Sequence, residues 1–122
     1  MQIAHVFFRD DAGALPARPL AVQVAQSPAE LRQGLLGRPY LDDGTGMLFD
    51  MGAEGQHVFH TIGLGFPIDI LFVSGDQRVT TILHNVMPGT PAVGADGRWV
   101  VEAPGGWAAR NALTVGMAMS FG

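Results

Sequence analysis

Apolar residues occur along the chain mostly in short runs, and glycine, proline or small polar residues separate these runs. Runs of this length between turn residues are typical of strands. The pattern predicts strands at residues 20–24, 47–49, 68–73, 78–86, 98–102 and 117–121. It also predicts turns at residues 42–46, 74–77 and 95–97, with the second of these forming a hairpin loop.

One segment has the signals of a helix. Ser27 is a good N-cap, a proline follows at the first helical position, and Glu30 stands where a capping box requires it. Leu31 and Leu35 are four residues apart and therefore share a helix face. We predict a helix at about residues 28–36, ended by the glycine and proline that follow.

The expected fold is mainly β. A short helical turn at about residues 107–113 follows a Pro-Gly-Gly break. With one helix and roughly six to eight strands, residues 1–122 should form one small domain that resembles a β-barrel or a curled sheet. The length of 122 residues leaves little room for a second domain.

Composition excludes several classes of protein. Charged residues make up only 15% of the chain and hydrophobic residues 48%, which argues against a disordered chain or a coiled coil. The absence of cysteine excludes thiolate catalysis and iron–sulfur clusters. A net charge of −4 argues against nucleic acid as a partner.

No run of apolar residues is long enough to span a membrane. The N-terminal residues lack the basic region of a signal peptide, and two aspartates follow them closely. We therefore expect either a cytoplasmic protein or an exported one whose leader is not part of the chain.

Asp69 is the most informative polar residue. It lies in the predicted strand 68–73, whose other residues are all apolar, so the strand should be buried on both faces. An unpaired buried carboxylate is very costly. Asp69 must therefore accept hydrogen bonds from backbone amides, pair with an arginine, or hold a proton. A binding or catalytic role is the alternative to a structural one.

Four further residues complete a candidate ligand-binding rim with Asp69. Glu102 ends a predicted strand beside a glycine-rich break, where ligands often bind. Arg38 follows the predicted helix and could pair with either acid. Gly105 could present a backbone amide, and Trp107 could cover a groove while partly exposed.

Histidines offer a weak signal for a metal site. His57, His60 and His84, together with Asp69, would be enough ligands for a zinc or iron site. Residues three apart point to opposite faces of a strand, however, so His57 and His60 would not converge there. We predict neither a metal nor a cofactor.

Five short blocks occur in an order that resembles the family called domain of unknown function 192 (uncharacterised protein family 0127). They are Gly34–Arg38, Gly46–Phe49, Pro67–Phe72, Val101–Gly106 and Val115–Gly116. The resemblance covers about residues 21–122 and implies a small β-rich domain without an assigned activity. Members of the family usually have an aromatic-Trp-Met-Lys-Asn-Thr stretch where this chain has residues 59–64, so a ligand surface built there would be altered.

Three functional hypotheses follow. The favoured one is a non-catalytic β domain that binds a small ligand, a peptide or a protein at the rim. The second is an enzyme that uses Asp69 and Glu102 as a carboxylate pair, which requires the two carboxyl groups to lie roughly 5 to 10 Å apart across a cleft. The third is a structural domain whose polar residues only satisfy its loops.

Overall fold

The computed structural model describes every residue from Met1 to Gly122. Seven strands and two short helices form its regular structure. In chain order they are β1 (Gln2–Arg9), β2 (Leu20–Ala25), α1 (Pro28–Gln33), β3 (Thr45–Phe59), β4 (Ile68–Val73), β5 (Val79–Val86), β6 (Val93–Pro104), α2 (Trp107–Arg110) and β7 (Ala118–Phe121). The predicted mainly β fold is confirmed.

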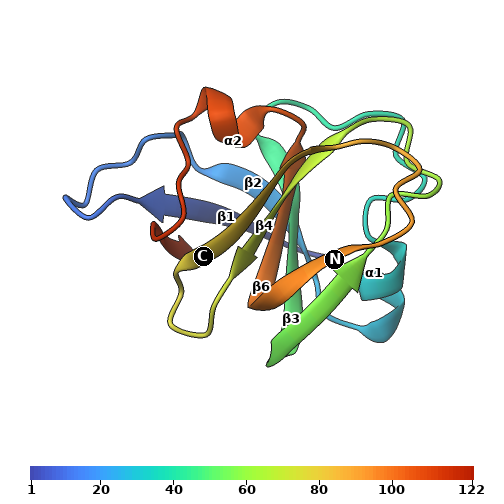
Figure 1. The fold of residues 1–122 in the computed structure, drawn as a ribbon, viewed down its shortest axis with the longest axis horizontal. Helices are drawn as coiled ribbons and strands as arrows, with labels where there is room; N and C mark the ends of the chain where they lie inside the picture. The colour runs from blue at the N-terminus through green and yellow to red at the C-terminus, as the bar shows by residue number, and fades with distance from the viewer.

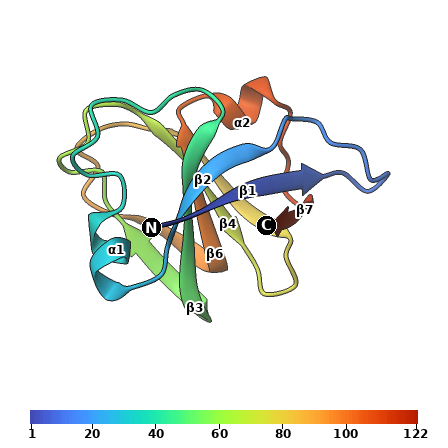
Figure 2. The same ribbon diagram turned by 180° about the vertical axis from the view of Figure 1, so that it is seen from behind.

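The strands form one curled sheet in the order β5-β4-β6-β3-β2-β1-β7 (Figure 1). Neighbouring strands are antiparallel except β2 and β3, which are parallel. A parallel pair needs a crossover connection, and α1 lies within it. The two ends of the sheet meet where Arg78 pairs with Ala118 and where the amide of Val79 donates to the carbonyl of Met117 at 2.9 Å. This contact is local, because only one isolated bridge joins the two edge strands, so the sheet is a curled half-barrel and not a fully paired barrel (Figure 2).

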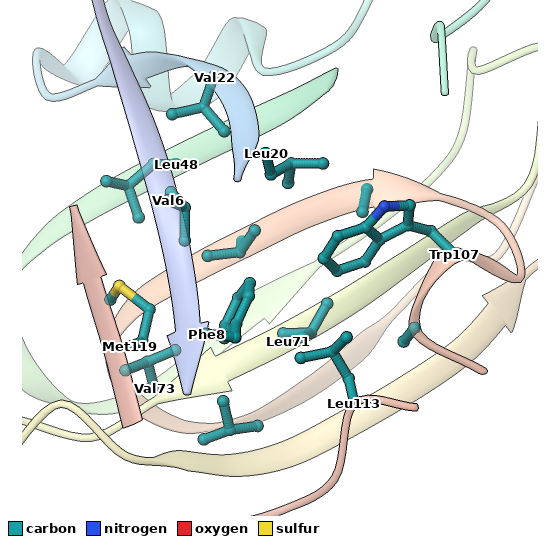
Figure 3. Packing of buried hydrophobic residues seen from close by; sticks show 14 of the residues in the cluster. Val6, Phe8, Leu20, Val22, Leu48, Leu71, Val73, Trp107, Leu113 and Met119 are labelled. Carbon is teal, nitrogen blue, oxygen red and sulfur yellow. The ribbon is translucent and has the colours of Figure 1, made fainter. Parts of the chain in front are cut away.

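The larger hydrophobic cluster comprises 17 buried residues, drawn from β1–β7 and α2 and the segment that follows it. Figure 3 shows the side chains of Phe8, Leu71 and Trp107 converging in this cluster. The ring centroids of Phe8 and Trp107 are 6.0 Å apart. Because side chains alternate between the two faces of a strand, β4 contributes Leu71 and Val73 to this cluster.

A second cluster covers the opposite face of the sheet. Its eight buried members include Ile70 and Phe72 of β4, Phe49 of β3, and Leu35 from the turn after α1. All six residues of β4 are buried, as the apolar pattern of residues 68–73 predicts. The two faces of the central strands therefore serve two separate clusters.

Helix α1 begins where the sequence predicts and ends earlier. The capping box is present: the Ser27 hydroxyl accepts from the Glu30 amide at 3.1 Å, and the Glu30 carboxylate accepts from the Ser27 amide at 3.0 Å. The helix ends at Gln33 instead of residue 36 because Gly34 adopts φ 48° and ψ −128°. The following turn carries Leu35 into the second cluster.

Replacement of Leu35 by alanine is expected to destabilise the protein by about 2 to 5 kcal/mol, because its side chain is 2% exposed and its removal leaves a cavity. Urea denaturation monitored by circular dichroism measures the change. A midpoint equal to that of the parent protein would show that this turn does not anchor α1 to the sheet.

Two parts of the strand and turn prediction are wrong. Strand β1 was not predicted, although Ala4, Val6 and Phe8 alternate with more exposed residues and point into the larger cluster. Residues 95–97 do not form a turn, because they lie inside β6 and pair with residues 55–57 of β3. Turn-forming residues alone do not end a strand when a long partner continues beside it.

Candidate functional site

The carboxylate of Asp69 is bound by three backbone amides. Its Oδ1 accepts from the amides of Asn85 at 2.7 Å and Gly106 at 3.0 Å, and its Oδ2 accepts from the amide of Ala108 at 2.8 Å. The residue is completely buried. These bonds tie β4 to β5 and to the start of α2. Of the alternatives that the sequence left for Asp69, the structure therefore shows hydrogen bonds from backbone amides.

The other predicted rim residues do not share one open site with Asp69. Gly105 and Trp107 lie beside the amides that bind Asp69, whereas Glu102 lies on the other face of the sheet. Trp107 is only 3% exposed and belongs to the larger core cluster, so the expectation of partial exposure is wrong. Arg38 donates a hydrogen bond to Gln23 of β2. Gly105 donates its amide to the carbonyl of Pro67 at 3.1 Å, in a site too tight for a side chain. Ligand binding by these residues stays a prediction, but they form no common rim.

Asp69 and Glu102 lie on opposite faces of the sheet. In the antiparallel ladder between β4 and β6, Ile70 pairs with Glu102 and Asp69 pairs with Ala103. Paired residues share a face and successive residues alternate. The two carboxyl groups therefore do not meet across a cleft, as a catalytic carboxylate pair requires.

Glu102 is buried in a setting without donors. Its residue is 4% exposed, and burial alone raises the pKa of its carboxyl from 4.5 to about 8. Each carboxyl oxygen either remains open to solvent or has a hydrogen-bond partner. No hydrogen bond or charge of the protein lowers this pKa, so the carboxyl group is mainly protonated at neutral pH. The group opens toward a cavity that Glu102 lines.

The backbone around Glu102 is closely packed. A Cβ added to Gly46 of β3 would lie 2.2 Å from the Glu102 carbonyl oxygen, so only glycine fits at this position. Glu102 pairs with Met47 on one side and Ile70 on the other. The close approach of β3 and β6 therefore fixes the position from which the Glu102 side chain extends.

Glu102 lines a pocket of about 400 Å³ between α1, β3 and β6. Pockets for small ligands span roughly 300 to 1,000 Å³, so this volume is large enough for one. Eight of the 13 lining residues are hydrophobic, among them Leu35, Phe49, Phe59 and Leu64. Figures 1 and 2 show α1 beside β3, at a distance from α2.

The remaining polar groups of the pocket lie at its rim. Arg32 and His60 are exposed, and the side-chain Nε2 of Gln33 donates to the carbonyl of Leu36 at 2.6 Å. The Nδ1 atom of His60 lies 3.2 Å from the Ile62 amide, which donates to it. Glu102 is thus the buried polar group of an otherwise apolar interior.

Most lining residues were not among the sequence candidates. Of the predicted rim, only Glu102 lines the pocket. A signal for burial was present in the sequence, because Glu102 follows Val100 and Val101 and precedes Ala103. The prediction placed Glu102 at a rim and did not use that signal. The stretch in which the chain departs from the family pattern contributes Phe59, His60 and Leu64 to the pocket.

No group of three or more histidine, cysteine, aspartate or glutamate side chains is placed to hold a metal ion. The four residues considered for such a site do not converge. Asp69 uses its oxygens for backbone amides, and His57 lies 3.1 Å from the Ala53 carbonyl through its Nε2 atom.

The fold and the pocket define a small half-barrel domain with one ligand-sized cavity beside its helix. Residues 10–121 match the model of DUF192, a family described as an uncharacterized ACR, and the chain belongs to this family. The match begins before residue 21, where the resemblance of the sequence blocks begins. None of the curated proteins matches the chain in sequence.

Two solved structures are similar over nearly the whole chain. A candidate transcription regulator from Sinorhizobium meliloti has a TM-score of 0.91 at 24% identity, over 98% of this chain and 94% of that one. A protein of unknown function from Novosphingobium aromaticivorans has a TM-score of 0.87 at 29% identity, over 98% of this chain and 86% of that one. The first of these similarities shows the fold alone. No helix has the length and apolarity that crossing a membrane requires.

Proposed function

We propose that the protein is a non-catalytic β domain that binds a small, largely apolar ligand in the pocket between α1, β3 and β6. The observation that supports this most is Glu102: a carboxyl group without a hydrogen-bond donor is costly to bury, and it faces the cavity. The cavity size favours a small molecule over a peptide or a protein partner.

Two observations favour binding over catalysis. The pocket contains one buried titratable group, whereas acid–base chemistry of the carboxylate-pair type divides its roles between two. Asp69, the second acid expected from the sequence, lies on the other face with its oxygens occupied. The paired-carboxylate enzyme therefore has no geometric support.

Nucleic acid is not part of this proposal. The Sinorhizobium meliloti protein is described as a candidate transcription regulator. At 24% identity, however, its similarity to this chain shows only a shared fold. The net charge of −4 provides no basic surface of the kind that holds a phosphate backbone.

Binding can be tested with N-phenyl-1-naphthylamine, an apolar dye whose fluorescence rises when it leaves water. We expect one dye molecule to bind per chain, with amide chemical-shift changes concentrated around the pocket. Leu64→Asp, which places a charge on the pocket wall, should weaken binding at least about tenfold.

Leu15→Asp provides the matched control, because Leu15 is 43% exposed and does not line the pocket. This variant should bind the dye as the parent protein does. If Leu64→Asp, shown to be folded by its spectrum, bound the dye with unchanged affinity, the proposed binding site would be wrong.

A further inference from the structure

The charged and titratable groups around the pocket differ in where they lie. Arg32 of α1 and His60, which follows β3, are exposed at the rim, while Glu102 of β6 is buried. The residues that β3 contributes to the pocket are all apolar. The residue of β4 that pairs with Glu102, Ile70, is also apolar. No cation of the protein therefore faces the Glu102 carboxyl group closely enough to hold it ionised.

An uncharged carboxyl group has a hydrogen-bond donor to offer. The O–H of a protonated glutamic acid donates one hydrogen bond, and its carbonyl oxygen accepts. In the apolar interior of this pocket, the protein supplies no acceptor for that proton. The group opens only toward the cavity, so a ligand that fills the cavity and brings an acceptor can satisfy this donor in an apolar setting, where a hydrogen bond is stronger than in water.

We propose that the pocket takes an apolar molecule that presents an uncharged hydrogen-bond acceptor, such as a ketone, ester or amide carbonyl, to the carboxyl group of Glu102. This inference rests on the proposed function and adds the chemical class of the ligand. The apolar body of the ligand contacts Leu35, Phe49 and Phe59, and its carbonyl oxygen accepts a hydrogen bond from the protonated carboxyl group of Glu102.

A cationic ligand is disfavoured by the same geometry. Binding an ammonium group would require Glu102 to ionise in an apolar site and the ammonium to lose its water as well. The two ligand classes also predict opposite pH dependence. A carbonyl ligand needs the protonated carboxyl group, whereas an ammonium ligand needs the carboxylate.

The test compares two probes with the same hexyl-length chain, N,N-dimethylhexanamide and hexylammonium, by amide chemical-shift titration at pH 6.5 and pH 9.0. The first probe accepts hydrogen bonds but cannot donate them. With the Glu102 pKa at about 8, its affinity should fall about tenfold between the two pH values. Hexylammonium should bind more weakly than the amide at pH 6.5.

Glu102→Gln separates the hydrogen bond from the titration. Its side-chain amide donates at both pH values, so N,N-dimethylhexanamide should bind this variant equally at pH 6.5 and pH 9.0. Glu102→Leu should bind the amide more weakly than Glu102→Gln does. Glu54→Gln, which changes an exposed glutamate outside the pocket, should keep the tenfold pH dependence of the parent protein.

The outcomes distinguish this inference from the proposed function. If the naphthylamine dye binds in the pocket but the parent protein binds N,N-dimethylhexanamide equally at both pH values, or not at all, the assigned ligand class is wrong and the binding site stands. Binding of hexylammonium that strengthens toward pH 9.0 would likewise overturn the ligand class. If the dye itself does not bind, the proposed function is wrong.

Discussion

The free energy of unfolding is expected to fall by roughly 3 to 4 kcal/mol between pH 5 and pH 8 because of Glu102. Its pKa is about 8 in the folded protein and 4.5 in the reference state for the unfolded chain. Between these values the folded state holds a proton that the unfolded state has lost. Stability from this group is therefore complete below pH 4.5 and declines by about 1.4 kcal/mol per pH unit until pH 8.

Urea denaturation at unit steps from pH 5 to pH 8 measures this slope. Glu102→Gln removes the titration while keeping the shape of the protonated side chain, so its stability should change much less over the same range. Glu54→Gln should retain the slope, because Glu54 is exposed. Parallel pH profiles for the parent protein and Glu102→Gln would mean that Glu102 ionises in the folded state as it does in water.

A decline of this size is large against the total stability of a small domain, which is about 5 to 15 kcal/mol. Burial of an unpartnered carboxyl group thus costs the free protein stability in mildly alkaline conditions. A ligand that binds the protonated form would raise the pKa of Glu102 further and shift the decline to higher pH. The pH profile therefore also provides a readout for ligand binding.

Local signals in the sequence were sufficient for the parts of the fold that depend on neighbouring residues. The capping box of Ser27 and Glu30 fixes the start of α1, and the loop at residues 74–77 joins β4 to β5. The length of β3 and β6 depends instead on their long pairing, which runs through a register shift between Asp50 and Gly55. Such pairing is set by tertiary contacts, which override turn propensity at residues 95–97.

The candidate site also has a part that neighbouring residues predict and a part that depends on tertiary contacts. Burial of Asp69 follows from the apolar residues on both sides of it, and its need for amide donors follows from burial. The pocket around Glu102 could not be predicted in this way, because its walls come from α1, β3, β6 and the loop after β3. These segments meet only because β2 and β3 are parallel and α1 crosses between them. The sequence pattern does not specify that crossover.

Removal of the Asp69 carboxylate is expected to destabilise the protein by about 3 kcal/mol or more. Asp69→Ala leaves the buried amide of Ala108 and the partly buried amides of Asn85 and Gly106 without their acceptor, and each unsatisfied amide costs about 1 to 3 kcal/mol. Asp69→Asn should cost less, about 1 to 3 kcal/mol. Its remaining oxygen can still accept from Asn85 and Gly106, while its NH₂ group faces the Ala108 amide, which is also a donor.

Hydrogen exchange distinguishes this account from a general loss of packing. In Asp69→Asn the amide of Ala108 should lose protection before those of Asn85 and Gly106, whereas in Asp69→Ala all three should lose it together. Asp96→Asn, at an exposed aspartate, should change neither the denaturation midpoint nor these amides. If Asp69→Ala unfolded at the same urea concentration as the parent protein and kept the three amides protected, Asp69 would not be the group that ties β4 to β5 and α2.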